Sequence, residues 1–351
     1  MLSGWRGLGV FWAAVLVLLS GGALVLQVLG PPPVPRSART MVSAAHPPAG
    51  VPAPAPLVSR HIAAPPSDRP GRSTPGPIAD PDPALLEPGP GGAQAMLPKI
   101  AEDGRRPSQF YAAGFDQTTR RPRIGILLAG IGLDQAASEK AIRDLPAGVS
   151  LAVSPYGTHL DTVLGDARLA GHEYLLSIPM EPQGSPQVDP GPLALLASLT
   201  VNDNLDRLHR LLALVQGYVG VTDALGEQRG ARFAGVPRLM GPVLAEVARR
   251  GLLYVDARPP DAGGQAVQNQ VWSVDADLVV DEPADTIDAK LAQLEQLARE
   301  HGQALGVAGA PSPVVVQHIV AWSNGLMNRG FVLAPVSALV RPPAEVAASG
   351  Q

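Results

Sequence analysis

Residues 124–155 read IGILLAGIGLDQAASEKAIRDLPAGVSLAVSP, and this stretch decides the class of fold. The apolar run 124–131 has the length of a buried strand, and a second such run follows at 149–155. Between the two runs, Asp134 can cap a helix that continues to about Leu145. A strand, a helix and a strand in direct succession are typical of a parallel α/β sheet.

The same alternation continues toward the end of the chain. Further strands are expected at 173–180, 218–225, 252–258, 276–280, 304–309 and 331–339, with helices at 158–170, 201–215, 237–250, 285–301 and 314–328. Seven or eight such units in about 220 residues favour a (β/α) barrel of seven or eight parallel strands over an open sheet. We therefore predict an α/β fold with one folded domain over 121–341, followed by a short disordered tail over 342–351.

The beginning of the chain has the composition of a membrane anchor. Residues 8–30 are almost wholly apolar, and as a helix they would span about 34 Å, enough to cross a hydrocarbon core of about 30 Å. A cleavable signal peptide has a shorter apolar region and a small-residue cleavage site, whereas Pro31-Pro32-Pro33 follows here. We predict an uncleaved, single-pass signal anchor, with residues 1–7 in the cytoplasm and the folded domain in the periplasm, at the inner membrane.

A proline-rich stretch separates this anchor from the folded domain. Residues 31–110 hold 20 of the 38 prolines, and no apolar periodicity persists up to residue 120. Such a segment buries too little apolar surface to offset the entropy of ordering it. The sequence predicts a disordered linker over 31–120, which would act as a semi-stiff tether.

Composition and charge exclude several classes of function. The chain has no cysteine, which excludes a disulfide scaffold, a Cys-ligated zinc site and a thiol nucleophile. Its net charge of −4 argues against nucleic acid as a partner. The glycines at 130 and 132 suggest a dinucleotide-binding turn, but Gln135 stands where the third glycine would fall, so an ordinary tight turn is the better interpretation.

Charged side chains occur at several predicted strand ends, where parallel α/β folds place their functional residues. These candidates for a residual cleft are Glu181, Asp223, Asp256 and Arg258. Carboxylates near an arginine can bind a cation or a sugar hydroxyl, and the alternative is a structural salt-bridge network. The histidines do not form a ligand set, and Trp272 and Trp322 are better explained as core residues than as sugar-stacking platforms.

An ordered set of short stretches resembles the divergent polysaccharide deacetylase family, bacterial envelope proteins related to metal-dependent carbohydrate deacetylases. The stretches are Arg123–Gly132, Ala152–Pro155 with Thr158 and His159, Ala170–Glu173, Ile178–Pro182, Asp189–Pro192, Gly220 with Val221 and Gly226, Arg249–Leu252 with Asp256 and Arg258, and Pro335–Ser337. The resemblance covers about 122–341 and implies a deacetylase-like barrel.

The resemblance also implies what an active site should contain. Active relatives carry adjacent aspartates at the end of the first strand and histidines at later strand ends, and these hold a divalent metal that activates a water. The aligned positions of this chain carry neither carboxylate nor imidazole: they are Ala129, Gly130, Ser177, Ala224 and Ala310. We therefore expect the metal site of the family to be lost, and we expect no metal or other cofactor.

These observations lead to one main hypothesis and two alternatives. The main hypothesis is a catalytically inactive, membrane-anchored envelope protein linked to cell-wall or exopolysaccharide metabolism, which binds a glycan such as peptidoglycan, or an envelope protein. The first alternative is an active metal-dependent deacetylase or hydrolase that uses rearranged residues such as Glu181, Asp223 and Asp256. The second is a protein–protein scaffold.

Overall fold

The computed structural model describes residues 73–225, 228–258, 271–280 and 283–343, all of which belong to the compact unit Pro66–Gln351. The predicted anchor over 8–30, the first part of the predicted linker and nearly all of the predicted tail lie outside these residues. Within them, no helix is both long enough and apolar enough to cross a bilayer. The anchor therefore stays a prediction from the sequence.

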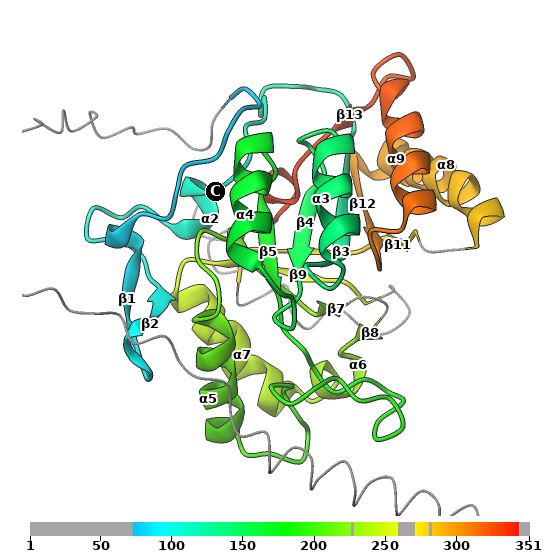
Figure 1. Cartoon of the computed structure of the whole chain (residues 1–351). Coiled ribbons are helices and arrows are strands. Elements are labelled where there is room, and N and C mark those ends of the chain that lie inside the picture. The colour runs from blue at the N-terminus through cyan, green and yellow to red at the C-terminus, as the bar shows by residue number, and fades with distance from the viewer. Residues whose placement is uncertain (1–72, 226–227, 259–270, 281–282, 344–351) are drawn as a thin grey trace, which may run out of the picture. The chain divides into compact units, whose positions relative to one another are not determined.

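A parallel sheet of nine strands forms the centre of the part that the structure describes (Figure 1). Eight of its strands follow one hydrogen-bonded path in the order β10-β9-β6-β5-β4-β3-β12-β11, and β13 pairs with the start of β3. The predicted parallel α/β class is thus confirmed. The strands are β3 (Arg123–Ile131), β4 (Ser150–Val153), β5 (Tyr174–Ser177), β6 (Gly220–Thr222), β9 (Leu253–Asp256), β10 (Ser273–Asp275), β11 (Leu278–Val279), β12 (Gln303–Ala308) and β13 (Val332–Leu333).

The two edge strands of this path are consecutive in the chain, since only Ala276 and Asp277 separate them. The N–H of Ala276 donates to the carbonyl oxygen of Asp256 in β9 (2.8 Å), whereas the N–H of Asp277 donates to the carbonyl oxygen of Leu305 in β12 (2.8 Å). The Asp277 carboxylate also accepts the N–H of Leu305 (2.7 Å). One short segment therefore joins both edges, and the curled sheet fits the predicted deacetylase-like barrel.

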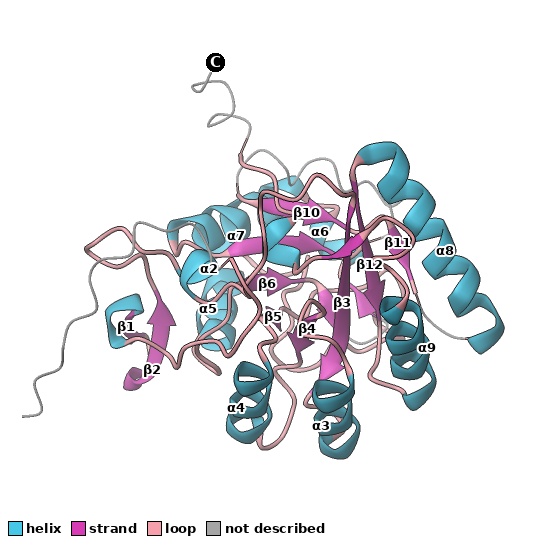
Figure 2. Ribbon diagram, turned by 90° about the horizontal axis from the view of Figure 1, so that it is seen from above, coloured by secondary structure: helices cyan, strands magenta, loops and turns pink. Residues whose placement is uncertain are grey.

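Helices cover the outer face of this curled sheet (Figure 2). Ile126 and Tyr254 belong to a core shared with the helices, whereas their neighbours Leu127 and Val255 belong to a second, inner core. This alternation follows from the period of two along a strand. The helices are α3 (Gln135–Asp144), α4 (Leu160–Ala170), α5 (Val201–Leu212), α6 (Ala231–Ala234), α7 (Pro237–Arg249), α8 (Ala284–His301) and α9 (Pro313–Asn324).

Local signals explain where several elements begin and end. Asp134 accepts the N–H of Ala137 (2.9 Å) and caps α3, as predicted. The predicted strand 218–225 is shorter, because Asp223 interrupts it and leads into a hairpin. The two strands of that hairpin are β7 (Ala224–Leu225) and β8 (Gln228–Arg229). The predicted strand 331–339 is reduced to β13, because Pro335 has no N–H to donate to a ladder.

Residues 73–120, here called the N-terminal extension, correct the predicted linker. They contain ordered elements, and side chains such as Leu85, Tyr111 and Phe115 belong to the inner core of the sheet. A few apolar residues order this Pro-rich segment because the curled sheet supplies the surface that they cover. The disordered linker is therefore wrong for this stretch, and the folded domain includes it. The elements of the extension are β1 (Leu86–Gly89), β2 (Gly92–Pro98) and α2 (Pro107–Phe110).

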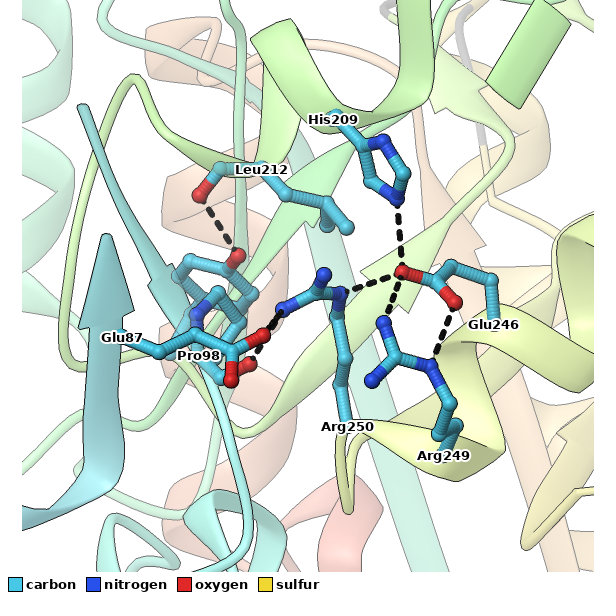
Figure 3. Close-up of polar contacts among 8 residues, drawn as sticks. Glu87, Pro98, His209, Leu212, Glu246, Arg249 and Arg250 are labelled. Carbon is cyan, nitrogen blue, oxygen red and sulfur yellow. Dashed lines mark hydrogen bonds and ion pairs between the residues drawn. The ribbon is translucent and has the colours of Figure 1, made fainter. Parts of the chain in front are cut away.

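One buried arginine fixes the β1–β2 hairpin to the helical layer (Figure 3). Arg250 directly follows α7 and is 2% exposed. Its guanidinium donates to the carbonyl oxygen of Pro98 (2.8 Å) and to Glu87 Oε1 (3.0 Å), both in the hairpin. Its Nε donates to Glu246 Oε1 (2.7 Å) in α7. A single side chain therefore satisfies acceptors from two parts of the chain that lie far apart in sequence.

The carboxylate of Glu246 collects the cationic groups around this arginine (Figure 3). Besides Arg250, it accepts from His209 in α5 (2.7 Å) and from Arg249 (2.7 and 2.8 Å). Burial alone would raise the pKa of Glu246, but these hydrogen bonds and the charge of Arg250 hold that pKa well below its usual range. The ionised Glu246 carboxylate therefore stabilises the folded domain at any pH above the usual carboxylate pKa. This contribution is lost as the pH falls through the lowered pKa that Glu246 has in the folded protein.

We predict that Arg250→Leu lowers the free energy of unfolding by about 3 kcal/mol, because it leaves Glu246 and the Pro98 carbonyl without their buried partner. The matched control is Arg249→Ala, whose side chain is 58% exposed and bonds to the same carboxylate. This control should change stability by less than about 1 kcal/mol. Urea denaturation of both variants measures the difference, and equal effects would contradict the anchoring role of Arg250.

Candidate functional site

The carboxyl end of β3 carries the two positions that align with the aspartate pair of active relatives. Ala129 is fully buried, and Gly130 has a φ of 76°. A Cβ on Gly130 would lie 3.1 Å from the carbonyl oxygen of Gly309 and 3.5 Å from the Cα of Ala310, beyond the end of β12. An aspartate at 130 would therefore need a left-handed backbone and a shift of the neighbouring segment. Neither position offers a metal ligand.

The other three aligned positions do not replace these missing donors. Ser177 ends β5, and its buried hydroxyl has no hydrogen-bond partner in the part of the chain that the structure describes. Ala224 is fully buried at the start of β7, and Ala310 is exposed after β12. A methyl group cannot coordinate a metal or accept a proton, and a lone hydroxyl is a weak ligand.

Three of the four predicted cleft residues lie together beyond β6 and at the end of β9, and we call them the Asp223 cluster: Asp223, Asp256 and Arg258. Arg258 Nε donates to Asp256 Oδ1 (2.8 Å), and its Nη2 donates to Oδ2, which completes a bidentate ion pair. Asp223 Oδ1 accepts the N–H of Ala257 (2.7 Å). Asp223 Oδ2 lies 3.6 Å from Arg258 Nε and has no hydrogen-bond partner among the residues that the structure describes.

Burial makes Asp223 the proton-binding member of this cluster. Burial is the largest effect and, with the nearby Asp256 carboxylate, raises the pKa of Asp223 to about 7, against the opposing effects of the Ala257 N–H and Arg258. Both oxygens of Asp256 accept hydrogen bonds from the Arg258 guanidinium, whereas Asp223 accepts none from it among the described contacts. Burial alone would lower the pKa of Arg258, but its hydrogen bond to Asp256 raises it, so the guanidinium stays charged.

Glu181, the fourth predicted cleft residue, has a different set of partners. Its Oε2 accepts the N–H of Ala197 (2.7 Å), and its Oε1 pairs with Arg232 Nη1 (3.2 Å). Its backbone carbonyl accepts the N–H groups of Arg232 and Phe233 at the start of α6. These contacts join the loop after β5 to α6, and the described contacts of Glu181 do not include the Asp223 cluster.

The sequence reasoning missed Tyr254, which belongs beside this cluster. Its side chain is fully buried, and its hydroxyl has no hydrogen-bond partner in the described structure. Burial raises its pKa well above the usual value, and the charges of Asp223 and Asp256 raise it further. The spacing in the sequence could have identified Tyr254. Residues two apart in a strand share a face of the sheet, and Tyr254 precedes Asp256 by two positions in β9.

The residues present do not fit the divalent metal that the family implies. Over the described ranges, no group of three or more His, Asp or Glu side chains is placed to hold a metal ion. The Asp256 carboxylate is bound to Arg258 and Asp223 Oδ1 accepts a backbone N–H, so in the cluster only the buried Asp223 Oδ2 has no described hydrogen bond. A metal site needs several converging, deprotonated ligands. The two carboxylates of the Asp223 cluster are buried and lie beside the cationic Arg258.

Three histidines of the described residues have structural partners: His172, His209 and His318. The ring nitrogens of His172 lie 2.8 Å from the carbonyl oxygen of Val149 and 3.2 Å from that of Ile142, and burial lowers the pKa of this imidazole. His318 pairs with Asp288 (2.6 Å) on the neighbouring helix.

We predict that Asp223→Asn stabilises the domain at about pH 8 by roughly 2 kcal/mol and has little effect near pH 4. The folded pKa of Asp223 is raised from 3.8 to about 7, so its contribution is fully present below about pH 4 and is lost as the pH rises through 7. Asparagine keeps the acceptor for the Ala257 N–H and does not titrate. Urea denaturation across this pH range measures the difference in the free energy of unfolding between the variant and the parent chain.

Asp256→Asn is the matched control for this prediction. It removes the carboxylate that accepts from both Nε and Nη2 of Arg258, so the buried guanidinium keeps only the more distant Asp223 carboxylate, 3.6 Å from its Nε. We expect a loss of about 3 kcal/mol at both ends of the pH range. If Asp223→Asn destabilises the domain at alkaline pH as Asp256→Asn does, Asp223 is the charged member of the pair and the assignment is wrong.

Comparisons with known proteins agree with the fold and with the resemblance. A crystal structure of an uncharacterized protein from Agrobacterium tumefaciens C58 superposes with a TM-score of 0.64 at 39% identity, covering 70% of this chain and 99% of that chain. An uncharacterized protein from Haemophilus influenzae is 24% identical over 212 residues, which are 59% of this chain and 71% of that protein. The model of a family described as divergent polysaccharide deacetylase matches residues 126–340. Since this match spans more than half of the sequence, the chain belongs to the divergent polysaccharide deacetylase family.

Proposed function

We propose that this chain is a membrane-anchored envelope protein whose deacetylase-like domain binds a glycan without hydrolysing it. One observation carries the proposal. The domain keeps the family fold and a buried charged cluster at the strand ends, yet the five aligned positions provide no carboxylate or imidazole. The domain therefore has the fold of the family but lacks the carboxylates and imidazoles that would bind the metal and catalyse deacetylation.

Two chemical requirements of deacetylation are unmet at these strand ends. Hydrolysis of an acetyl group needs an activated water, which related enzymes obtain from a bound divalent metal. It also needs a base within hydrogen-bond reach of that water. Positions 129 and 130 lack the carboxylates, and the Asp223 side chain is 0% exposed, so it does not reach a substrate atom. These facts support an inactive domain.

The loop after β5 supports a role in glycan binding. Tyr156, after β4, is half-buried and donates its hydroxyl to the carbonyl oxygen of Pro190 (3.0 Å). Arg232 is 49% exposed and is oriented by Glu181 Oε1 and the carbonyl oxygen of Ser185. Both side chains thus pack on the segment 181–195. An aromatic ring and an oriented guanidinium are groups that contact sugar rings and hydroxyls.

The predicted anchor gives the proposal its location. A single apolar span over 8–30, followed by residues 31–72 as the remaining part of the predicted linker, would hold the domain in the periplasm at the inner membrane. Peptidoglycan or an exopolysaccharide would be the glycan that a domain in that place binds.

One observation favours a second candidate, an active hydrolase that uses rearranged residues. Asp223 has its pKa raised to about 7, which is the range that a general acid or base needs at neutral pH. This candidate requires the cluster to open, because the Asp223 side chain is closed off in the present structure.

We predict that the purified full chain is retained on peptidoglycan and on acetylated chitooligosaccharides but releases no acetate from them, with or without added zinc, cobalt or manganese. Co-sedimentation or affinity electrophoresis measures retention, and an enzyme-coupled acetate assay measures release. Metal-dependent acetate release that disappears in Asp256→Ala would overturn the proposal in favour of the active hydrolase.

Matched variants locate the binding surface. Arg232→Ala should weaken retention severalfold, because it removes the exposed guanidinium beside segment 181–195. Arg143→Ala, on α3 and 64% exposed, is the control and should leave retention unchanged. Equal retention of both variants and the parent chain would rule out this surface.

A further inference from the structure

A second site lies at the opposite end of the strands from the positions discussed above. A cavity of about 320 Å³ opens where the strands begin: Arg123 is the first residue of β3, Leu253 the first of β9, and Trp272 immediately precedes β10. The N-terminal extension supplies another wall, including Arg106 and Phe115. This size is at the lower end of the range for small-molecule sites and suits one or two sugar units.

The charged groups of this cavity are both cationic. Among the described residues no acidic side chain lines it, although the buried carboxylate of Glu173 accepts hydrogen bonds from the lining residues Ala113 and Ser337. Neither Arg106 nor Arg123 forms a described ion pair. Arg123 is held rigidly, because it donates to Gln117 Oε1 (3.0 Å) and to the carbonyl oxygens of Gln117 (3.0 Å) and Ala338 (2.9 Å). Its guanidinium also stacks over the Phe115 ring at 5.2 Å. Its guanidinium is therefore oriented by neutral acceptors, and the exposed Asp116 carboxylate, whose pKa this charge helps to lower, does not hydrogen-bond to it.

The remaining lining combines an aromatic surface with neutral polar groups. Trp272 is 37% exposed, so the prediction that it is a core residue is wrong, whereas Trp322 is partly buried against the outer core. The Trp272 carbonyl accepts the N–H of Tyr254 (2.9 Å), which fixes the backbone that carries the indole. Gln109 and Ser108 add side chains that can donate to and accept from hydroxyl groups.

We propose that this cavity binds a carboxylate-bearing sugar, such as a hexuronic acid unit or an acidic amino sugar. The indole of Trp272 provides an apolar face for a pyranose ring, the amides and hydroxyl pair with ring substituents, and Arg106 binds the carboxylate through its planar fork of donors. Arg123 supplies the positive potential that favours an acidic ligand over a neutral one.

This site is independent of the glycan surface proposed above, because its residues come from the strand beginnings and the N-terminal extension. Variants of each site therefore separate the two proposals. If only Arg232→Ala loses glycan binding, the glycan binds at the strand ends. If only Trp272→Ala loses it, the glycan binds in this cavity.

The test compares methyl β-glucuronide with methyl β-glucoside and with acetate, using isothermal titration calorimetry on the purified full chain. The two glycosides differ only in a carboxylate, and acetate supplies a carboxylate without a ring. We expect the glucuronide to bind at least about tenfold more tightly than either control. Arg106→Ala should reduce its affinity to that of the glucoside, and Trp272→Ala should weaken both glycosides.

Arg120→Ala is the matched control, since this exposed arginine of the extension does not line the cavity, and it should bind like the parent. Thermal denaturation confirms that each variant folds, which the exposure of Arg106 and Trp272 favours. The proposal is overturned by absent glucuronide binding, by acetate binding as tightly as the glucuronide, or by unchanged affinity in Trp272→Ala.

Discussion

The segment that passes from β10 to β11 is the constraint on which the rest of the domain depends. Ala276 bonds to β9 and Asp277 bonds to β12, so two neighbouring residues join strands that are separated by about fifty positions in the chain. This junction curls the parallel sheet. As a result, the carboxyl ends of the strands gather on one side of the curled sheet and their amino ends gather on the opposite side. The substituted family positions lie at the carboxyl ends of the strands, and the cavity with Trp272 lies at their amino ends.

The N-terminal extension completes this arrangement from outside the region of the family match. Its apolar side chains enter the inner core, and Arg250 ties its hairpin to α7 through buried hydrogen bonds. The extension also supplies one wall of the cavity at the strand beginnings. The segment therefore serves both stability and the proposed recognition of an acidic sugar, which a disordered linker could not do.

Local signals in the sequence predicted the architecture well, because short apolar runs and caps such as Asp134 act over a few residues. They also placed Asp223, Asp256 and Arg258 near one another, since parallel strands end on one side of a sheet. The extension was missed because its anchoring residues are sparse in a Pro-rich background. The partners of Glu181 depend on where a long loop folds back, which no local pattern specifies.

Over the described residues, the strand ends of this deacetylase-family domain do not bring together the ligands that a metal centre needs. The most direct measurement is a zinc titration of the purified full chain by isothermal titration calorimetry, with Asp223→Ala and Asp256→Ala in parallel. Because neither carboxylate is placed to hold a metal ion, we expect any zinc binding to be unchanged by either substitution. One tightly bound equivalent of zinc in the parent chain that disappears in Asp256→Ala would show that the strand ends do hold a metal.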